Sequence, residues 1–491
     1  MPFNFKIDYI VFYFTTTIIR NQKEKTLNMA DVLKYFFAPK SVCVIGASAT
    51  AGKPGNVVIK NIWDLGFDGK VYLVNPRGGQ IEGYKVYKSV EELPENIDQA
   101  VVTLPASLAP ETVRALGKKG VKAIVLAASG FSEVDQVGED LQYELIEAVK
   151  VSGARVLGPN TTGHVSVPSK YTSSFFPLGK IPRGSVSYIT QTGNFCGISL
   201  RHIMSAENYG IARSCGLGNK VDIDECDLLE FLGRDKETKS IFLYLESIKN
   251  PKRFLRVARR VSSQKPVFLL KGGASDAGAA AAVAHTGSLA ADGRVVDGAI
   301  DQSGVTRLNK YSHLFQLAKA LDKQSLPRGN RVSFLSPSGA FTVCLTDICR
   351  SLDVEVPRLE ERTTKRLQKY APPFIRMRNP VDIFGSVGLV GYEKAYGDAL
   401  DAVLSDRNID AAVVIMMLTS ETGIPKMDFL VDVSEKYPSK PVYVTFMGQH
   451  EHNVAAKEYL EPRGIPCYMQ VEEPFEVLSI LAKCRMHMRG L

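Results

Sequence analysis

The stretch Ser41-Val-Cys-Val-Ile-Gly-Ala-Ser-Ala-Thr-Ala-Gly-Lys-Pro-Gly55 decides the fold of the N-terminal part of the chain. It begins with an apolar, β-branched run, which is typical of a strand buried on both faces. The run ends in glycine, and a helix is expected after the turn. Glycines let the backbone approach a phosphate closely, and the first N–H groups of the helix are free to bind it. The order strand, glycine turn, helix therefore predicts an α/β domain that binds a phosphate-containing ligand.

Similar apolar runs recur along the whole chain, with helix-length segments between them. The remaining runs lie at 71–75, 100–104, 123–127, 154–157, 185–190, 241–245, 267–270, 304–308, 332–335, 411–416 and 442–445. We also expect a helical turn after 71–75 and a loop at 216–227 that leads into an acidic helix start. Apolar strands that alternate with helices form doubly wound parallel sheets. The sequence therefore predicts an α/β fold of three consecutive doubly wound parallel-sheet domains at 29–163, 164–325 and 326–491, after a non-core N-terminal extension at 1–28.

The composition is that of a globular protein with a mild positive charge. Of the 491 residues, 45% are hydrophobic and 23% are charged, and the net charge is +8 at pH 7. Because the chain has no long block of Lys and Arg with interleaved aromatic residues, we expect no nucleic-acid partner. A modest positive excess suits a polyanionic small ligand, such as a nucleotide or coenzyme A.

Cysteine usage and the N-terminal segment bear on the compartment. The eight cysteines include no Cys-x-x-Cys pair, so the sequence predicts neither a zinc site nor a disulfide framework, and a cytoplasmic location is expected. The apolar run at 9–19 is too short to cross a bilayer as a helix. It has no clear basic start or cleavage site, so we expect no membrane partner, with a weak membrane anchor as the alternative.

Two short segments of the first domain indicate which nucleotide-containing cofactor it binds: NAD, NADP or coenzyme A. Gly46, Ala47 and Ser48 form the turn after the first strand, but the full Gly-x-Gly-x-x-Gly spacing is absent. An NAD site usually has an acidic residue at the end of the second strand, where this chain has Asn75, Pro76 and Arg77. An arginine there can hold a ribose phosphate, which favours coenzyme A and leaves an NADP-dependent oxidoreductase as an alternative. The structural alternative is that the domain binds neither cofactor, that Gly46 only allows the chain to turn after the strand, and that Arg77 is solvated.

The second domain carries a second anion-binding pattern. Thr190-Gln-Thr-Gly193 follows a strand and opens a helix, so the hydroxyls of Thr190 and Thr192 and the N–H of Gly193 are candidate phosphate ligands. Glu246 lies at the end of the strand at 241–245.

His285 lies in a run of very small residues, between Lys271 and Ala290, with Thr286 and Ser288 beside it. Imidazole can take a phosphoryl group covalently, and a carboxylate such as Glu246 can orient one ring nitrogen while the other attacks. The structural alternatives are an alanine-rich helix with a buried histidine and an ordinary carboxylate at a strand end.

Together these residues resemble the α subunit of the ADP-forming acyl-CoA synthetases, which are relatives of succinyl-CoA synthetase. The resemblance runs from about residue 36 to the C-terminus. Ala284-His-Thr-Gly-Ser-Leu-Ala290 is similar to the family's phosphohistidine loop, which implies that His285 is phosphorylated. Glu246 fits the glutamate that steadies the phosphohistidine, and Thr190-Gln-Thr-Gly193 resembles the Ser-Gln-Ser-Gly phosphate turn.

Other segments carry the resemblance into the first and third domains. Gly158-Pro-Asn160 matches the family's Gly-Pro-Asn, which implies that Asn160 lies at the phosphate site. Thr161-Thr162 departs from the family, in which a cysteine and a leucine or proline are more usual. Segments 44–48 and 74–76 resemble the Rossmann-like CoA-binding domain, and 379–382 matches a flavodoxin-like ligase domain. The second and third domains are therefore both expected to be flavodoxin-like.

The resemblance implies an acid–thiol ligase. It would interconvert acyl-CoA, ADP and phosphate with a carboxylic acid, CoA and ATP, through an acyl phosphate and a phosphohistidine. The family needs an ATP-grasp module for ADP or ATP with Mg²⁺, and the chain shows no motif for one. A separate ATP-grasp β subunit and a hetero-oligomer, with a heterotetramer as the family expectation, are therefore implied.

Two further alternatives stay open. A CoA-binding or acyl-CoA-binding regulatory protein that has lost catalysis would share most of these motifs. His450-Glu-His452 could belong to a zinc site, but a third ligand is not apparent, and we favour a solvated loop and no metal site. The sequence specifies neither the acyl group, the direction of the reaction, the choice of ADP or GDP, nor the stoichiometry.

Overall fold

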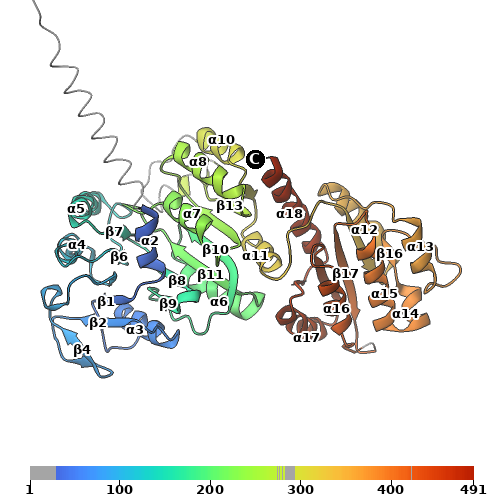
Figure 1. The fold of residues 1–491 in the computed structure, drawn as a ribbon, viewed down its shortest axis with the longest axis horizontal. Coiled ribbons are helices and arrows are strands. Elements are labelled where there is room, and N and C mark those ends of the chain that lie inside the picture. The colour runs from blue at the N-terminus through green and yellow to red at the C-terminus, as the bar shows by residue number, and fades with distance from the viewer. Residues whose placement is uncertain are drawn as a thin grey trace, which may run out of the picture.

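The computed structural model describes residues 29–273, 275, 277–278, 280–281, 293–421 and 423–490. Within them lie three mostly parallel sheets, each covered by helices (Figure 1), which confirms the predicted α/β fold class. We call each sheet with its covering helices the first, second and third domain; the predicted boundaries between the domains stay a prediction. In the described part of the chain, no helix is long and apolar enough to cross a membrane.

The first sheet has the strand order β3-β4-β2-β1-β5-β6-β7. Its strands are β1 (Ser41–Ile45), β2 (Lys70–Val74), β3 (Gln80–Ile81), β4 (Tyr84–Tyr87), β5 (Gln99–Val102), β6 (Ala123–Leu126) and β7 (Arg155–Leu157). The helices are α2 (Met29–Phe37), α3 (Pro54–Asp64), α4 (Ala109–Lys118) and α5 (Gln136–Ser152). The expected helical turn after 71–75 is wrong. Glu82 and Gly83, both with positive φ, close an antiparallel hairpin of β3 and β4 there.

The second sheet has the order β14-β13-β12-β10-β11-β8-β9. Its strands are β8 (His164–Ser166), β9 (Tyr171–Thr172), β10 (Arg183–Thr190), β11 (Ile211–Gly216), β12 (Ser240–Leu245), β13 (Val267–Lys271) and β14 (Thr306–Leu308). The helices are α7 (Glu225–Arg234), α8 (Pro251–Ser262), α10 (Gly293–Gln302) and α11 (His313–Lys323), with a helical segment formed by η4 (Phe195–Ser199), α6 (Leu200–His202) and η5 (Ile203–Glu207). β8 pairs antiparallel with β11 and β9, so this sheet is mixed and not purely parallel as expected.

The third sheet is parallel throughout, in the order β16-β15-β17-β18-β19. Its strands are β15 (Val332–Ser336), β16 (Val381–Asp382), β17 (Ala411–Leu418), β18 (Val442–Gly448) and β19 (Cys467–Tyr468). The helices are α12 (Gly339–Ser351), α13 (Glu361–Gln368), α14 (Phe384–Val390), α15 (Tyr392–Ser405), α16 (Asp428–Lys436), α17 (His450–Leu460) and α18 (Glu473–Gly490). His450 and His452 lie in the first turn of α17, which corrects the expected loop.

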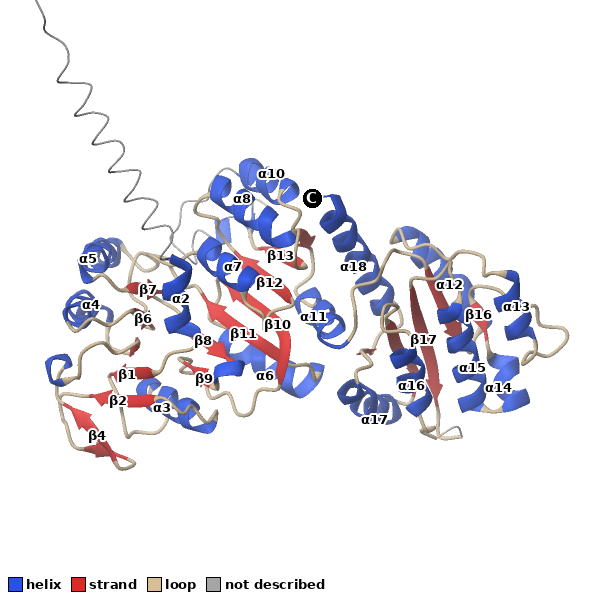
Figure 2. Ribbon diagram, in the orientation of Figure 1, coloured by secondary structure: helices blue, strands red, loops and turns tan. Residues whose placement is uncertain are grey.

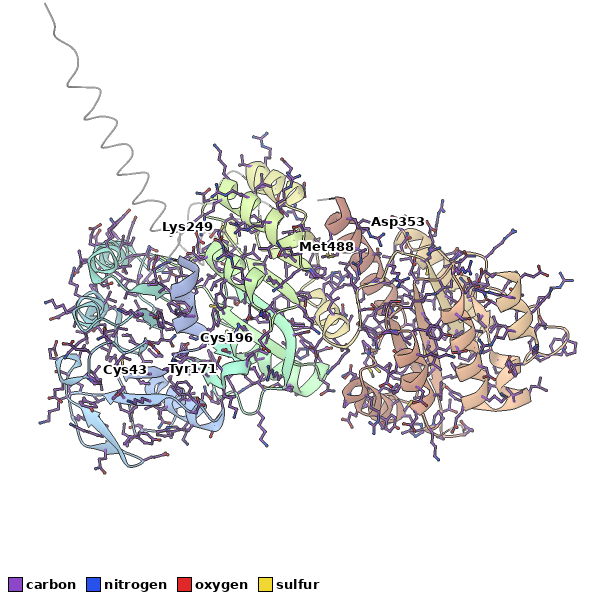
Figure 3. The ribbon with its side chains drawn as sticks, viewed as in Figure 1. Cys43, Tyr171, Cys196, Lys249, Asp353 and Met488 are labelled. Atoms are coloured by element: carbon purple, nitrogen blue, oxygen red, sulfur yellow. The ribbon has the colours of Figure 1, made fainter. Side chains whose placement is uncertain are left out.

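Two helices join neighbouring domains, as the ribbon in Figure 2 shows. Leu33, Phe36 and Phe37 of α2 are buried in one cluster with residues of β6, β7 and α7, so α2 packs between the first and second domains. On the other side, α18 packs against α11, and their leucines share a core with β15 and β17. Tyr171 of the second sheet is also buried in the first domain's core (Figure 3).

Candidate functional site

Three turns of the second domain lie at one edge of its sheet. β12 lies between β10 and β13, and all three strands are parallel, so their carboxyl ends meet at that edge. The turns that follow them are Gln191–Gly193 after β10, Glu246–Ser247 after β12, and Gly272–Gly273 after β13. The sequence-predicted phosphate turn and Glu246 are therefore neighbours in space.

Gln191 holds the first two turns together. Its buried side chain accepts hydrogen bonds at Oε1 from Glu246 N at 3.1 Å, Ser247 N at 3.0 Å and Ser247 Oγ at 3.3 Å. Its Nε2 donates to Ser247 Oγ at 3.0 Å. The backbone of Glu246 is thus fixed by a side chain of the phosphate turn. Sequence reasoning missed this role, because a glutamine inside a motif gives no sign of which backbone groups it will bind.

Glu246 lies half-buried where the chain leaves β13 toward the histidine loop. Tyr244 Oη donates to Glu246 Oε1 at 3.2 Å, and burial together with this carboxylate raises the pKa of Tyr244 to about 12. A methyl group placed on Gly272 would lie 3.3 Å from Glu246 Cγ, so the chain passes directly beside this side chain. His285, Thr286 and Ser288 lie outside the described residues.

Two lysines that contact the backbone of the Glu246 turn were not singled out by sequence reasoning. Lys271 Nζ donates to Glu246 O at 2.7 Å, and burial lowers the pKa of Lys271. Lys220 is 2% exposed, pairs with the fully buried Glu225 at 3.0 Å and donates to Ser247 O at 2.8 Å. Both lysines bind backbone carbonyls of the Glu246 turn, so they place positive charge beside the site and stiffen it. The loop sequence around Lys220 carries no pattern that marks this pairing.

The residues of the phosphate turn differ in accessibility. Gly193 is exposed and Thr192 is half-buried, with its hydroxyl accepting a hydrogen bond from Asn194 N at 3.3 Å. Thr190, by contrast, is fully buried, and its hydroxyl reaches Cys215 O at 3.5 Å. The expectation that the Thr190 hydroxyl faces a phosphate does not fit this placement, because the residue is still part of strand β10. Thr192 and Gly193 remain the candidates.

The segment 160–163 lies between the first and second sheets. Asn160 is exposed and adopts a left-handed backbone (φ 55°), and its Nδ2 donates to Asn219 Oδ1 at 3.4 Å. Thr161 Oγ1 donates to Gly216 O at 2.6 Å. Thr162 is 5% exposed, and a methyl group on Gly193 would lie 3.5 Å from its Cγ2. Both threonines that depart from the family pattern therefore adjoin the second sheet's carboxyl edge.

The first domain's candidate site has the tight geometry that its glycines predict. Gly46 has φ +90°, and Gly46 N and Ala47 N both donate to Val74 O at 3.0 Å. A side chain on Gly55 would overlap Gly46 O, so α3 begins in direct contact with this turn. Ser48 Oγ accepts a hydrogen bond from Thr50 N at 3.0 Å.

Asn75 joins the ends of β1 and β2. Its Nδ2 donates to Ala47 O at 2.8 Å, and its Oδ1 accepts a hydrogen bond from Arg77 N at 3.0 Å. Pro76 and Arg77 are exposed beside it. The structure thus brings together the two segments that were predicted to bind one nucleotide.

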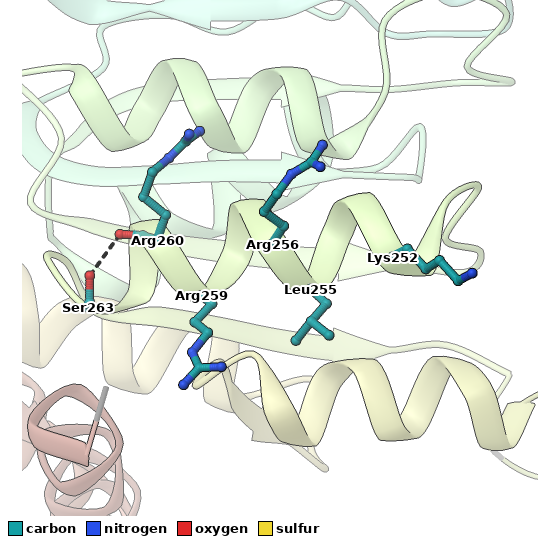
Figure 4. Close-up of a pocket in the computed structure, with 6 residues that line it drawn as sticks. All are labelled: Lys252, Leu255, Arg256, Arg259, Arg260 and Ser263. Carbon is teal, nitrogen blue, oxygen red and sulfur yellow. Dashed lines mark hydrogen bonds between the residues drawn. The ribbon is translucent and has the colours of Figure 1, made fainter.

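Other features of the described residues do not form a site of this kind. A hollow of about 490 Å³ lies along α8, lined by Lys252, Leu255, Arg256, Arg259, Arg260 and Ser263 (Figure 4). All its walls come from one helix and its C-terminal cap, so it cannot enclose a ligand. Among the residues that the structure describes, no three His, Cys, Asp or Glu side chains gather as metal ligands.

The chain is similar to known proteins over nearly its whole length. Residues 40–166 match the family described as CoA binding domain, and residues 183–321 match the succinyl-CoA ligase like flavodoxin domain. It is 37% identical to the acetate–CoA ligase [ADP-forming] I subunit alpha of Pyrococcus furiosus, covering 92% of this chain and 97% of that one. It is 34% identical to the acetate–CoA ligase [ADP-forming] II of Archaeoglobus fulgidus. That match covers 92% of this chain but only 67% of the relative.

A solved structure agrees with the sequence comparisons. The dinucleotide forming acetyl-coenzyme A synthetase 1 of Ca. Korarchaeum cryptofilum, in complex with phosphate and ADP, has 33% sequence identity and a TM-score of 0.86. The match covers 93% of this chain and 98% of that one, so all three sheets are included.

Proposed function

This chain belongs to the family of ADP-forming acyl-CoA synthetases, and from that premise we propose that it is the α-type subunit of such an enzyme. The reaction interconverts acyl-CoA, ADP and phosphate with a carboxylic acid, CoA and ATP. The substrate is a small carboxylic acid or its CoA thioester. Membership of this family does not favour a CoA-binding regulator that has lost catalysis.

The observation that carries the proposal is the meeting of three turns beside Glu246. Gln191 of the phosphate turn binds the backbone of Glu246, and Gly272, where the chain departs toward His285, lies against the Glu246 side chain. His285 follows Gly272 by 13 residues in the sequence, so the length of the chain allows it to reach the phosphate turn. This arrangement supports His285 as the phosphoryl carrier and Glu246 as the group that orients its imidazole.

The proposed cycle begins at the first domain. The nucleotide end of acyl-CoA binds at Gly46–Ser48 and Asn75–Arg77, where Arg77 faces the ribose phosphate. A phosphate oxygen attacks the thioester carbonyl, the C–S bond breaks, and CoA leaves as the thiol while an acyl phosphate forms. Thr192, Gly193 and Asn160 hold the phosphate during this step. Fixed N–H groups and hydroxyls of this kind supply most of the catalysis in such transfers.

The second half of the cycle uses the histidine. One imidazole nitrogen of His285 attacks the phosphorus of the acyl phosphate, and the carboxylate leaves. Glu246 accepts a hydrogen bond from the other ring nitrogen and so stabilises the positive charge that develops on the ring. The phosphoryl group then passes to ADP, which regenerates the free histidine.

We further propose that the nucleotide binds to a separate ATP-grasp subunit. Relatives of nearly the same length are named as alpha subunits, which implies a partner subunit. The Archaeoglobus relative, which is not named as a subunit, extends beyond the part that this chain matches. Magnesium would accompany the nucleotide. We also infer a cytosolic location, because the cysteines are free and all except Cys344 are buried.

Labelling with radioactive phosphate tests the proposal directly. The purified chain is mixed with acyl-CoA and labelled phosphate, with and without an ATP-grasp partner, and compared with His285→Asn. We expect acid-labile label on the wild type and none on the variant, with CoA binding unchanged in both. Absence of label from the wild type under every pairing, with CoA still bound, would instead indicate the regulatory protein.

A further inference from the structure

A cavity of about 390 Å³ lies between the second and third domains. One wall is formed by β14, the edge strand of the second sheet, and by the turn into α11; the other is formed by α18 and the end of α12. Its polar lining includes Arg307, Asn309, Lys310, His313, Glu476 and Lys483. None of the lining residues belongs to the turns at 190–193, 246–247 or 272–273 that form the proposed reaction site. Clefts between domains are common positions for small-molecule sites.

His313 is the observation that points to a ligand. It lines the cavity and is 3% exposed, yet neither ring nitrogen makes a hydrogen bond within the described residues. Nε2 stands 3.5 Å from Glu476 Oε2, which is beyond a well-formed hydrogen bond. Burial lowers the pKa of His313, although Glu476 opposes this effect. A buried imidazole whose nearest partner, Glu476, is too far for a well-formed hydrogen bond is costly, and a polar group in the cavity would satisfy it.

Positive charge exceeds negative charge around the cavity. Lys310 Nζ lies 2.7 and 2.8 Å from the two carboxylate oxygens of Glu476, the single acidic residue in the lining. Lys483 is exposed at the rim, and the described residues offer it no ion pair. Arg307 pairs outward with Asp297 at 2.8 Å. Lys310 and Arg307 each have a carboxylate partner, so Lys483 leaves the cavity with an excess of positive charge that attracts an anion.

The rest of the lining consists of the hydroxyl residues Thr306 and Ser479 and of three apolar residues. Leu308 of β14, Leu352 after α12 and Ile480 of α18 complete the wall. A ligand that fits this lining has a charged head and an apolar body, because a bare inorganic ion would leave the leucines and the isoleucine uncovered.

We propose that this cavity binds a small organic anion, whose carboxylate or phosphate head contacts Lys310, Lys483 and His313 and whose apolar body lies against Leu352 and Ile480. Its walls come from two domains, so an occupant ties α18 to the edge of the second sheet. Binding then favours this relative position of the third domain, which couples the ligand to any motion between the two domains.

Calorimetric titration of the full chain tests the proposal, with phenyl phosphate as the probe. Hexanoate tests whether a carboxylate can serve as the head group. Inorganic phosphate tests a charged head group that has no apolar body. Lys483→Glu is the main variant, because this exposed side chain can change without disturbing the fold. Lys118→Glu, an exposed lysine of α4, makes the same charge change far from the cavity.

We expect phenyl phosphate or hexanoate to bind the wild type and Lys118→Glu equally, and to bind Lys483→Glu about tenfold more weakly, because an attraction becomes a repulsion. His313→Phe, which fills the cavity, should remove the same binding event. Equal affinity for all four proteins would overturn the proposal, because the probe would then occupy the phosphate turn alone. Binding of inorganic phosphate as tight as that of both organic anions would overturn the assignment of the apolar wall.

Discussion

Gln191→Leu should slow phosphorylation of His285 without unfolding the protein. The substitution keeps the volume and the buried position but removes every hydrogen bond that the side chain makes to the Glu246 turn. Gln191 accepts three hydrogen bonds and donates one. At about 1 kcal/mol net for each, roughly 4 kcal/mol of restraint on Glu246 and Ser247 disappears.

A part of this loss should appear in the reaction barrier. If half of the 4 kcal/mol had held Glu246 against the histidine, the barrier would rise by about 2 kcal/mol, which corresponds to a rate about 30-fold lower. The rate is measured by quenched-flow labelling with acyl-CoA and radioactive phosphate. CoA affinity serves as the internal readout and should not change, because the hydrogen bonds of the Gln191 side chain go to the Glu246 turn of the second domain.

Two matched variants separate positioning from general damage. Gln191→Glu keeps an oxygen acceptor for Glu246 N and Ser247 N, and should recover a large part of the rate. Gln136→Leu makes the same chemical change on α5, where the side chain only meets Asp140 at 3.3 Å, and should leave the rate unchanged. A labelling rate for Gln191→Leu within threefold of the wild type would refute the positioning role of this glutamine.

Three further predictions concern buried groups. Gly55→Ala places a methyl group on Gly46 O, which costs roughly 1–3 kcal/mol and should weaken CoA binding in calorimetry, whereas Gly388→Ala meets open space and should not. Lys220→Met leaves Glu225 buried without its partner and should cost about 3–5 kcal/mol in chemical denaturation, part of which Lys220→Met with Glu225→Gln should restore. Burial lowers the pKa of His164 to about 4, below the unfolded value of 6.5, so the unfolded state takes up the proton first. Its contribution of about 3 kcal/mol is complete above pH 6.5 and is lost as the pH falls toward 4; a pH series of unfolding curves that lacks this loss would contradict the assignment.

Most of the sheet strands that sequence reasoning found have a predominantly apolar run, although those at 185–190 and 304–308 also contain polar residues. β11 was missed, because Arg213 and Ser214 interrupt its apolar pattern; the expected loop at 216–227 overlaps it only at Gly216. Both side chains are buried nonetheless, and Arg213 Nε pairs at 2.8 Å with Asp235, the C-terminal cap of α7. The partner is 22 residues away in sequence, so no local pattern could have indicated that this arginine is compatible with a strand.

The candidate site divides in a similar way. The nearness of Thr192, Gly193 and Glu246 was predictable, because parallel strands end at a common edge and residues that follow neighbouring strands lie close together. Their role at a phosphate stays a prediction. Thr190 was placed wrongly, because the motif does not show where the strand ends. Gln191 and Lys220 act on backbone groups of another turn, and backbone donors and acceptors leave no trace in the sequence.

The loop after β11 explains how chemistry in two domains can be coordinated. Asn219 Nδ2 donates to Glu133 Oε2 at 2.7 Å in the first domain, while the adjacent Lys220 donates to Ser247 O at 2.8 Å beside Glu246. Backbone hydrogen bonds from Asn219 and Val221 to Pro159 and Gly158 fix the same loop to the Gly-Pro-Asn turn. One short segment therefore contacts the first domain, the turn that carries Asn160, and the turn that carries Glu246. In the proposed mechanism, a shift at the contact with the first domain is transmitted to the turn that carries Glu246, since the loop cannot shift in one of these contacts without straining the others.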